Sequence, residues 1–276
     1  MELEPGIHQL TFGRAPLPGF PAPNAFLVFG SDASVLIDSG WENDDDHRAR
    51  VEYLREVAAP PVAEIIITHR HPDHGGGALH MHCHTGAPIA CHPNDRDVIE
   101  LDRLHGEAEV AVELQGGERR DLGGLAVEAL FAPGHTLGSL ALYVPERGAL
   151  FTSDTVMGVS TTAISPSDGS LSQYMRTLDL FKEVGARVMY PGHGEPVRDP
   201  AKRLDALIVH RREREAAVLR ELAAGPLAPA ELRARIYVNL PQSREPLAER
   251  QIVTTLLKLA DDDAVAEDSD GRYALR

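Results

Sequence analysis

The sequence predicts an α+β protein with two domains, a large one over residues 1–200 and a small, winged-helix-like one over residues 201–276. Short apolar segments rich in β-branched residues recur in the first part, and they indicate buried strands. Several of these segments end at a histidine or an aspartate. The net charge of −15 is uneven, because all of the acidic excess lies before residue 201. Beyond Pro200 the pattern changes to three helical segments and a hairpin.

The segment Glu64–Thr68 is a β-branched run typical of a buried strand. Residues two apart in an extended segment point the same way, so the first two histidines that follow can approach one metal ion together. The next two side chains come after Pro72, where the chain turns. One segment can therefore serve two neighbouring metal ions. Its four potential ligands are His69, His71, Asp73 and His74.

Further potential ligands follow other strand-like segments. The segments at residues 125–130, 148–152 and 187–190 each precede such a residue, and a glycine stands beside both of the histidines. The residues are His135, Asp154 and His193. Another strand-like segment, Val35–Ile37, ends at Asp38. A second cluster, at residues 80–84, has no matching ligands elsewhere, so we expect it to be a solvated segment.

In type and order these residues match the H-x-H-x-D-H motif and the later His, Asp and His of the metallo-β-lactamase superfamily. The chain resembles that superfamily over essentially its whole length, which implies an αββα sandwich with the catalytic function in residues 1–200. Asp38 matches the acidic residue behind the metals, where a carboxylate would orient a ligating imidazole. The resemblance implies these ligand sets: His69, His71 and His135 for one metal, Asp73, His74 and His193 for the second, and Asp154 as the bridge.

Within the superfamily the chain most resembles the β-lactamase-like protein 2 family. The shared features include the P-G-H-T turn at residues 133–136 and a D-G-S-L-x-x-Y loop, here residues 168–174. The sequence departs from the pattern at Ser153, where many members have glycine before the bridging aspartate. The serine adds a β-carbon and a hydroxyl next to the metals, which leaves the predicted ligand set intact and the local backbone geometry open.

The resemblance implies a hydrolase in which two divalent metal ions supply a metal-bound hydroxide. Imidazole and carboxylate ligands fit zinc, although manganese or iron would tolerate the same set. We expect Asp73 to align the hydroxide for attack, which makes it the catalytic residue. A mononuclear iron persulfide dioxygenase would not need His74 and His193. A non-enzymatic, metal-stabilised binding module is a weaker alternative, because structural zinc sites close their coordination with four protein ligands.

Two substrate classes stay open. The family resemblance implies either an endoribonuclease that cuts single-stranded RNA or a thioesterase that acts on acyl groups of carrier protein, coenzyme A or small thioesters and esters. Phosphates are normally bound by Lys and Arg, so an acidic large domain is a poor general surface for RNA. Arg70 and the basic run at residues 210–214 are candidates for phosphate contacts. The alternative for the basic run is a solvated helix face.

The region after Pro200 predicts helices at residues 202–223, 230–237 and 246–260, followed by a hairpin at residues 264–275. Sequence-specific DNA binding is not expected, because acidic residues surround the third helix. A lid over the metal cleft or a homodimer contact is the expected role. A signal peptide and a membrane span of roughly 20 apolar residues are both missing. The sequence also has only two cysteines, too few for the disulfide framework of a secreted protein. It therefore predicts a cytoplasmic protein without a membrane partner.

Overall fold

The computed structural model describes residues 1–100 and 109–276. These residues form two compact units. The first unit comprises Met1–Ala132, Gly138–Thr161 and Gly185–Pro200, and the second comprises Pro133–Leu137, Thr162–Val184 and Ala201–Arg276. The second unit thus contains the predicted small domain and two segments that precede it. Within the described ranges, no helix is both long enough and apolar enough to cross a membrane.

The first unit contains a seven-stranded sheet whose strands follow one another in sequence order, from β1 to β7. The strands are β1 (Glu2–Glu4), β2 (Ile7–Thr11), β3 (Asn24–Phe29), β4 (Ser34–Ile37), β5 (Val62–Ile66), β6 (Ile89–Cys91) and β7 (Val110–Glu113). Pairing is antiparallel up to β4 and parallel from β4 to β7. Parallel neighbours need crossover connections. These contain α1 (Asp44–Val57), α2 (Pro72–Gly75), α3 (Ala78–Thr85) and α4 (Pro93–Glu100).

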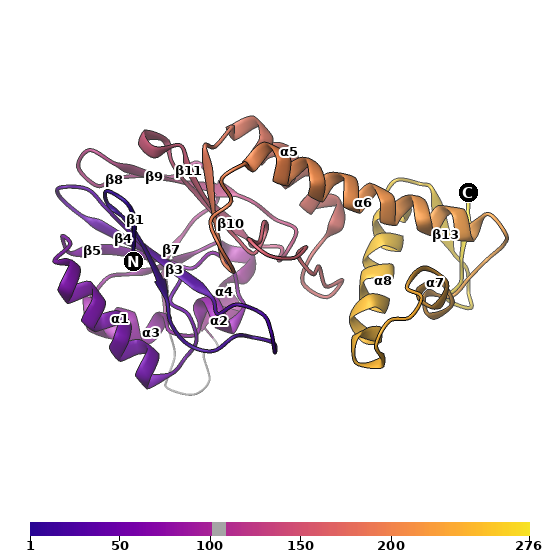
Figure 1. Cartoon of the computed structure of the whole chain (residues 1–276), viewed down its shortest axis with the longest axis horizontal. Helices are drawn as coiled ribbons and strands as arrows, with labels where there is room; N and C mark the ends of the chain where they lie inside the picture. Colours follow the sequence, from indigo (N-terminus) through magenta and orange to yellow (C-terminus); the bar gives the residue numbers. More distant parts are fainter. Residues whose placement is uncertain (101–108) are drawn as a thin grey trace. The chain divides into compact units, whose positions relative to one another are not determined.

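A second sheet of five strands faces the first, in the order β12-β11-β10-β9-β8 (Figure 1). Its strands are β8 (Arg119–Asp121), β9 (Ala126–Phe131), β10 (Leu140–Val144), β11 (Ala149–Ser153) and β12 (Val188–Pro191), and η1 (Pro145–Arg147) is a short 3-10 turn between β10 and β11. Only β11 and β12 pair in parallel. The main core lies between the sheets, where Phe26 and Ile37 pack with Leu142 and Phe151.

A second apolar layer lies between the first sheet and helices α1 and α3. On β4 and β5, Leu36 and Ile65 enter this layer, whereas Ile37 and Ile66 enter the core between the sheets. Side chains alternate along a strand, so a strand covered on both faces must be apolar at every position. This explains the continuous apolar run that predicted β5.

The second unit contains α5 (Leu171–Val184) and the helical region after residue 200. That region comprises α6 (Pro200–Leu222), α7 (Pro229–Ile236), η2 (Gln242–Arg244), α8 (Glu245–Asp261), β13 (Val265–Glu267) and β14 (Tyr273–Leu275). Its core joins α6, α7 and α8 through Val218, Leu232 and Leu256, and the hairpin adds Val265 and Tyr273. The predicted three helices and hairpin are therefore present, with ends that differ by only a few residues.

Candidate metal centre

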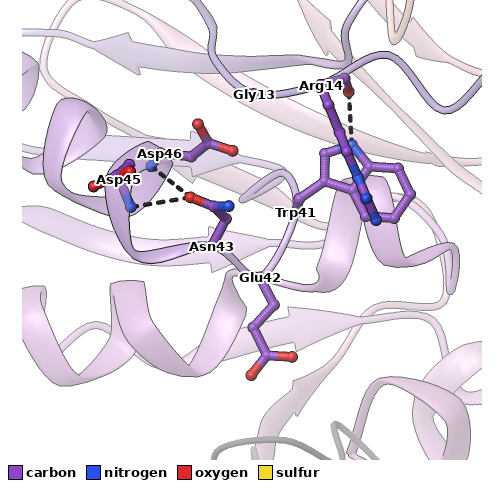
Figure 2. Close-up of a pocket in the computed structure, with 7 residues that line it drawn as sticks. All are labelled: Gly13, Arg14, Trp41, Glu42, Asn43, Asp45 and Asp46. Atoms are coloured by element: carbon purple, nitrogen blue, oxygen red, sulfur yellow. Dashed lines mark hydrogen bonds between the residues drawn. The ribbon is translucent and has the colours of Figure 1, made fainter.

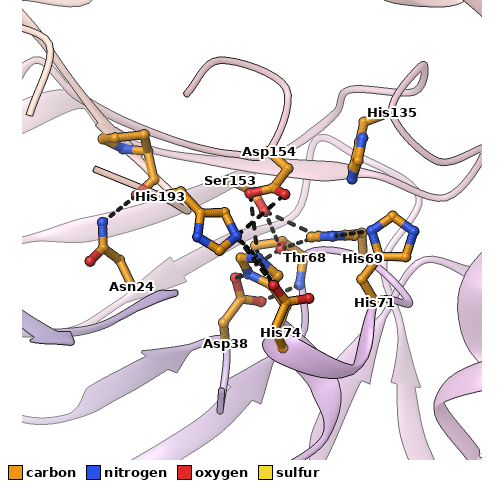
Figure 3. A network of polar contacts seen from close by, with 12 residues as sticks. Asn24, Asp38, Thr68, His69, His71, His74, His135, Ser153, Asp154 and His193 are labelled. Carbon is orange, nitrogen blue, oxygen red and sulfur yellow. Dashed lines mark hydrogen bonds and ion pairs between the residues drawn. The ribbon is translucent and has the colours of Figure 1, made fainter. Parts of the chain in front are cut away.

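The predicted ligands of the first unit gather where four strands end. Because β4 and β5 are parallel, and β11 and β12 are also parallel, each pair places its carboxyl ends at one edge of its sheet. Figure 3 shows the side chains from both edges turned toward one another. All of them are buried except His71, which is partly exposed. The residues are Asp38, His69, His71, Asp73, His74, Asp154 and His193.

Two imidazoles and two carboxylates direct their polar atoms to one point. Nε2 of His74 lies 3.3 Å from Nε2 of His193 and 3.4 Å from Oδ1 of Asp154. Nε2 of His193 lies 3.3 Å from Oδ2 of Asp73 and 3.6 Å from Oδ2 of Asp154. The ligand atoms of Asp73, His74 and His193 all lie within 4.8 Å of one another. Such a set of donors can surround one cation.

In both imidazoles, the nitrogen that faces away from this point, Nδ1, lies next to a hydrogen-bond acceptor. Nδ1 of His74 lies 2.8 Å from Oδ2 of Asp38, and Nδ1 of His193 lies 3.0 Å from the carbonyl oxygen of Pro21. A carboxylate or a carbonyl can only accept, so the proton of each neutral ring is assigned to Nδ1. The lone pair of Nε2 then points inward, which is the arrangement of metal-binding histidines.

His69 forms the neighbouring group with Asp154 and His74, whose ligand atoms also lie within 4.8 Å of one another. Nε2 of His69 lies 3.0 Å from Nδ1 of His71. Asp154 therefore faces ligand types of both predicted metal sites. This position suits a carboxylate that bridges two cations.

The backbone is constrained on both sides of the centre. Asp38 and Ser153 are non-glycine residues in the left-handed region, with φ of 60° and 46°. Asp38 accepts hydrogen bonds from the amide of Thr68 at 2.8 Å and from its hydroxyl at 2.9 Å. Oγ of Ser153 lies 2.6 Å from Oγ1 of Thr68. Ser153 is thus a left-handed residue whose hydroxyl joins the polar network.

The acidic groups change the pKa values of their neighbours. Burial alone would lower the pKa of His74, but the charges of Asp154 and Asp38 outweigh it and raise that pKa well above its usual value. Burial would raise the pKa of the Asp73 carboxyl, but the hydrogen bond from His193 and the charge of His74 hold it below its usual value. The centre therefore favours positive charge among its ligands.

His135 belongs to the second unit, on the turn between β9 and β10. Its side chain is buried, and its Nδ1 lies 3.0 Å from the carbonyl oxygen of Ala163. The amide of Ser170 donates to the carbonyl of Gly134 at 2.9 Å, and the amide of Leu137 donates to the carbonyl of Asp168 at 2.8 Å. The D-G-S-L loop thus supports the turn that carries His135, whose assignment to the first metal stays a prediction.

Close packing explains the glycine of that loop. A β-carbon at Gly169 would lie 2.5 Å from the carbonyl oxygens of both Gly134 and His135. Gly192 is also closely packed, beside two predicted ligands: a β-carbon there would lie 2.4 Å from Oδ1 of Asp154 and 2.7 Å from Cε1 of His74. A β-carbon at either glycine would clash with its neighbours.

Several residues considered from the sequence have other roles. Arg70 forms an ion pair with Asp95 at 2.8 Å. Arg211, expected on a solvated face, is buried, as is Tyr174. The cluster at residues 80–84 lies on α3 with its histidines and cysteine exposed, as expected. Sequence reasoning missed Asn24, whose side-chain amide donates to the carbonyls of Pro191 and Gly194 and so fixes the turn of His193.

A pocket of about 610 Å³ lies beside the start of α1 (Figure 2). Trp41 stacks under the guanidinium of Arg14 at 4.9 Å, and Asn43 caps α1 by accepting from the amides of Asp45 and Asp46. No predicted ligand is among its lining residues. Its polar groups therefore serve the helix end, and we assign it no ligand.

Comparisons with known proteins extend over both units. The family model described as the metallo-beta-lactamase superfamily matches residues 18–193, and that of a beta-lactamase associated winged helix domain matches residues 228–273. A protein named atrochrysone carboxyl ACP thioesterase, from Aspergillus fumigatus, is 27% identical over 255 residues, which cover 87% of this chain and 76% of that protein. A beta-lactamase-like protein 2 homolog from Caenorhabditis elegans is 25% identical over 247 residues, which cover 88% of this chain and 80% of that protein.

Solved structures show the same fold. A metallo-beta-lactamase family protein from Thermus thermophilus matches with a TM-score of 0.81 and 24% identity over all of both chains. A beta-lactamase domain protein from Burkholderia ambifaria matches with a TM-score of 0.84 and 19% identity, over all of this chain and 93% of the other. The sandwich and the C-terminal region are thus found together in other proteins.

Proposed function

We propose a metal arrangement and a substrate class for this chain, which belongs to the metallo-beta-lactamase superfamily and is therefore a metal-dependent hydrolase. The proposed enzyme holds two divalent cations and hydrolyses acyl thioesters. Its ligands are those predicted from the sequence: His69, His71 and His135 for the first cation, Asp73, His74 and His193 for the second, and Asp154 between them.

The orientation of the imidazoles carries the metal assignment. Each of His74, His135 and His193 has its Nδ1 next to a carboxylate or carbonyl acceptor, which fixes the ring and assigns Nε2 to the metal. The space that a β-carbon would fill at Gly192 lies between two of the ligands, Asp154 and His74. Mixed imidazole and carboxylate donors favour zinc, and manganese or iron is the alternative.

Two such cations would supply Lewis acidity, which makes a water molecule easier to deprotonate near neutral pH and an acyl carbonyl easier to attack. Asp73 accepts a hydrogen bond from the attacking water and directs its oxygen at the acyl carbon. The water oxygen bonds to the acyl carbon, the carbon–sulfur bond breaks, and its electron pair leaves with sulfur. One water proton passes through Asp73 to solvent, and the thiolate takes a proton from solvent.

The leaving group favours a thioester over a phosphodiester. A thiol has a pKa of about 8.5, so a thiolate departs without a general acid, whereas an alcohol oxygen is a much stronger base. Phosphate binding also needs cationic side chains. Two of the arginines considered for it have internal partners, because Arg70 pairs with Asp95 and Arg211 donates to the carbonyl of Thr162. The relative named as an acyl-carrier-protein thioesterase supports the same choice.

The test is hydrolysis of acyl-coenzyme A and of acyl-N-acetylcysteamine by zinc-loaded protein, followed by colorimetric detection of the released thiol. Asp73→Asn, prepared in the same way, controls for contaminating thioesterase. Release of thiol by the native chain alone is expected. End-labelled single-stranded RNA is assayed in parallel, and cleavage of RNA without thioester hydrolysis would replace this proposal with the endoribonuclease. The homodimer stays a prediction that these assays do not address.

A further inference from the structure

Three polar side chains of the helical region after residue 200 bind one loop of the second unit. On α6, Nη2 of Arg211 donates to the carbonyl of Thr162. On α8, Nε2 of Gln251 and Oγ1 of Thr254 donate to the carbonyl of Ile164 at 2.9 Å and 3.0 Å. We call Arg211, Gln251 and Thr254 the loop clamp. It anchors the residues on both sides of Ala163.

Two of the three residues of the loop clamp, Arg211 and Thr254, are buried, whereas Gln251 is partly exposed. Arg211 is 6% exposed and Thr254 is 3% exposed, while Thr162 and Ile164 are almost fully buried. The guanidinium of Arg211 also lies 5.1 Å above the ring centre of Tyr174, a cation–π contact. Burial of a cation is costly unless its hydrogen bonds are made. Helix packing alone therefore does not explain an arginine on the apolar face of α6.

The clamped loop leads directly to a predicted metal ligand. The carbonyl of Ala163, between the two anchored residues, lies 3.0 Å from Nδ1 of His135. On the other side of the turn, Oγ1 of Thr177 donates to the carbonyl of Pro133 at 2.7 Å. The imidazole of His135 is thus held by a backbone acceptor whose own position depends on α6 and α8.

We propose that the loop clamp positions His135 for metal binding, so that the helical region after residue 200 sets the affinity of the first metal site. This rests on the proposed assignment of His135 as a ligand. An imidazole binds a metal well when its outer N–H is fixed by an acceptor, and loss of such an acceptor costs roughly 10- to 100-fold in affinity. Removing one clamp bond leaves the acceptor in place but less fixed, so we expect about a tenfold loss.

Thr254 and Thr255 provide a matched pair for the test. Both are buried on α8, and both donate to a carbonyl of the preceding turn, that of Arg250 at 2.9 Å or Gln251 at 2.8 Å. Only Thr254 also faces the loop: its single hydroxyl proton is shared between the carbonyls of Arg250 and Ile164. Thr254→Val and Thr255→Val therefore differ in one relevant bond. Arg211→Met removes a second clamp bond, with Arg220→Met on the exposed face of the same helix as its control.

The measurement is the affinity of each zinc site, by competition with a chromophoric chelator, together with the melting temperature of the metal-free chain. We expect Thr254→Val and Arg211→Met to weaken one site about tenfold while Thr255→Val and Arg220→Met match the native chain. In a His135→Ala background the effect of Thr254→Val should disappear. If Arg211→Met fails to fold, the comparison of Thr254→Val with Thr255→Val still tests the inference.

Two results would overturn the inference. One is native zinc affinity in a folded Thr254→Val variant. The other is an equal effect of Thr254→Val with and without His135, which would indicate general destabilisation. A different result, native zinc affinity in His135→Ala itself, would refute the assignment of His135 under the proposed function and the inference with it. Suppose that the native chain binds only one zinc ion and that His135→Ala weakens this binding. The two-metal arrangement would then be refuted, while the inference about His135 would stand.

Discussion

Oγ of Ser153 lies 3.2 Å from Nδ1 of His69, so the residue that replaces the expected glycine contacts a predicted metal ligand. One consistent proton assignment runs from the His69 ring to Ser153, from Ser153 to Thr68, and from Thr68 to Asp38. The hydroxyl of Ser153 then connects His69, a predicted ligand, to the carboxylate of Asp38, which holds His74.

The first prediction separates the hydroxyl of Ser153 from its backbone conformation. Ser153→Gly loses the hydrogen bond but relieves a left-handed residue that costs about 1 kcal/mol, so its melting temperature should stay near that of the native chain. Ser153→Ala loses the bond and keeps the strain, so it should melt lower. Zinc affinity should fall roughly tenfold in both. Native affinity in both variants would show that the contact with His69 has no effect on the metal.

The second prediction concerns Asp73. Asp73→Asn should lower kcat for thioesters by about 10²- to 10³-fold, because an amide does not accept the water proton, while KM changes only a few-fold. Turnover and KM are measured at saturating zinc, with bound metal quantified, since Asp73 is also a proposed ligand. Unchanged turnover in the zinc-saturated variant would remove Asp73 from the chemistry.

The third prediction uses the space at Gly192. In Gly192→Ala the new β-carbon must displace Asp154 or His74, because it would lie 2.4 Å and 2.7 Å from their atoms. We expect zinc affinity to fall at least tenfold in a chain that remains folded. Isothermal titration with zinc measures the affinity, and circular dichroism checks the fold. A folded variant that binds zinc like the native chain would contradict the crowding at this position.

The fourth prediction is a pH dependence that arises from a histidine outside the predicted ligand set. Burial, followed by the charges of His80 and Arg50, lowers the pKa of His47 to about 4. The unfolded chain, with a pKa of about 6.5, binds this proton more readily. The stability that neutral His47 contributes is therefore present above pH 6.5 and lost as the pH falls toward 4, by on the order of 2–3 kcal/mol.

Urea unfolding of the metal-free chain between pH 4 and pH 7 measures this dependence. His47→Gln should flatten the curve in this range, whereas His84→Gln, at an exposed position of α3, should leave its slope unchanged. Identical slopes for native chain and His47→Gln would show that His47 is protonated at the same pH in both states.

Much of the fold follows from periodicity and strand ends. The predicted sandwich with its winged-helix-like region is confirmed, and so is membership of the superfamily. The strand β5 was predictable because apolar residues on both faces leave a continuous run, and α6 to α8 have clear end signals. The ligand types were also visible, because each follows such a strand. The metal identity, the number of metals and the cytoplasmic location stay predictions.

The supports of the ligands were not predictable, for a physical reason. The carbonyl of Pro21 holds His193 across 172 residues, and any residue type offers the same carbonyl. Arg211 did leave a signal, because it lies on the apolar face of α6 with Leu204, Leu207 and Ile208. A charged residue at that spacing indicates a buried partner, which the interpretation as a solvated face overlooked.

The centre also determines when a metal can be acquired during synthesis of the chain. His74 and His193, whose Nε2 atoms face each other, are separated by 119 residues. They follow strands of different sheets, so the proposed second site is incomplete until both sheets have formed and packed. With this ligand set, we expect metal uptake to follow folding, in contrast to small zinc domains in which the metal drives folding. A nascent chain that ends before residue 193 would present only part of this ligand set, so we expect it to bind zinc weakly.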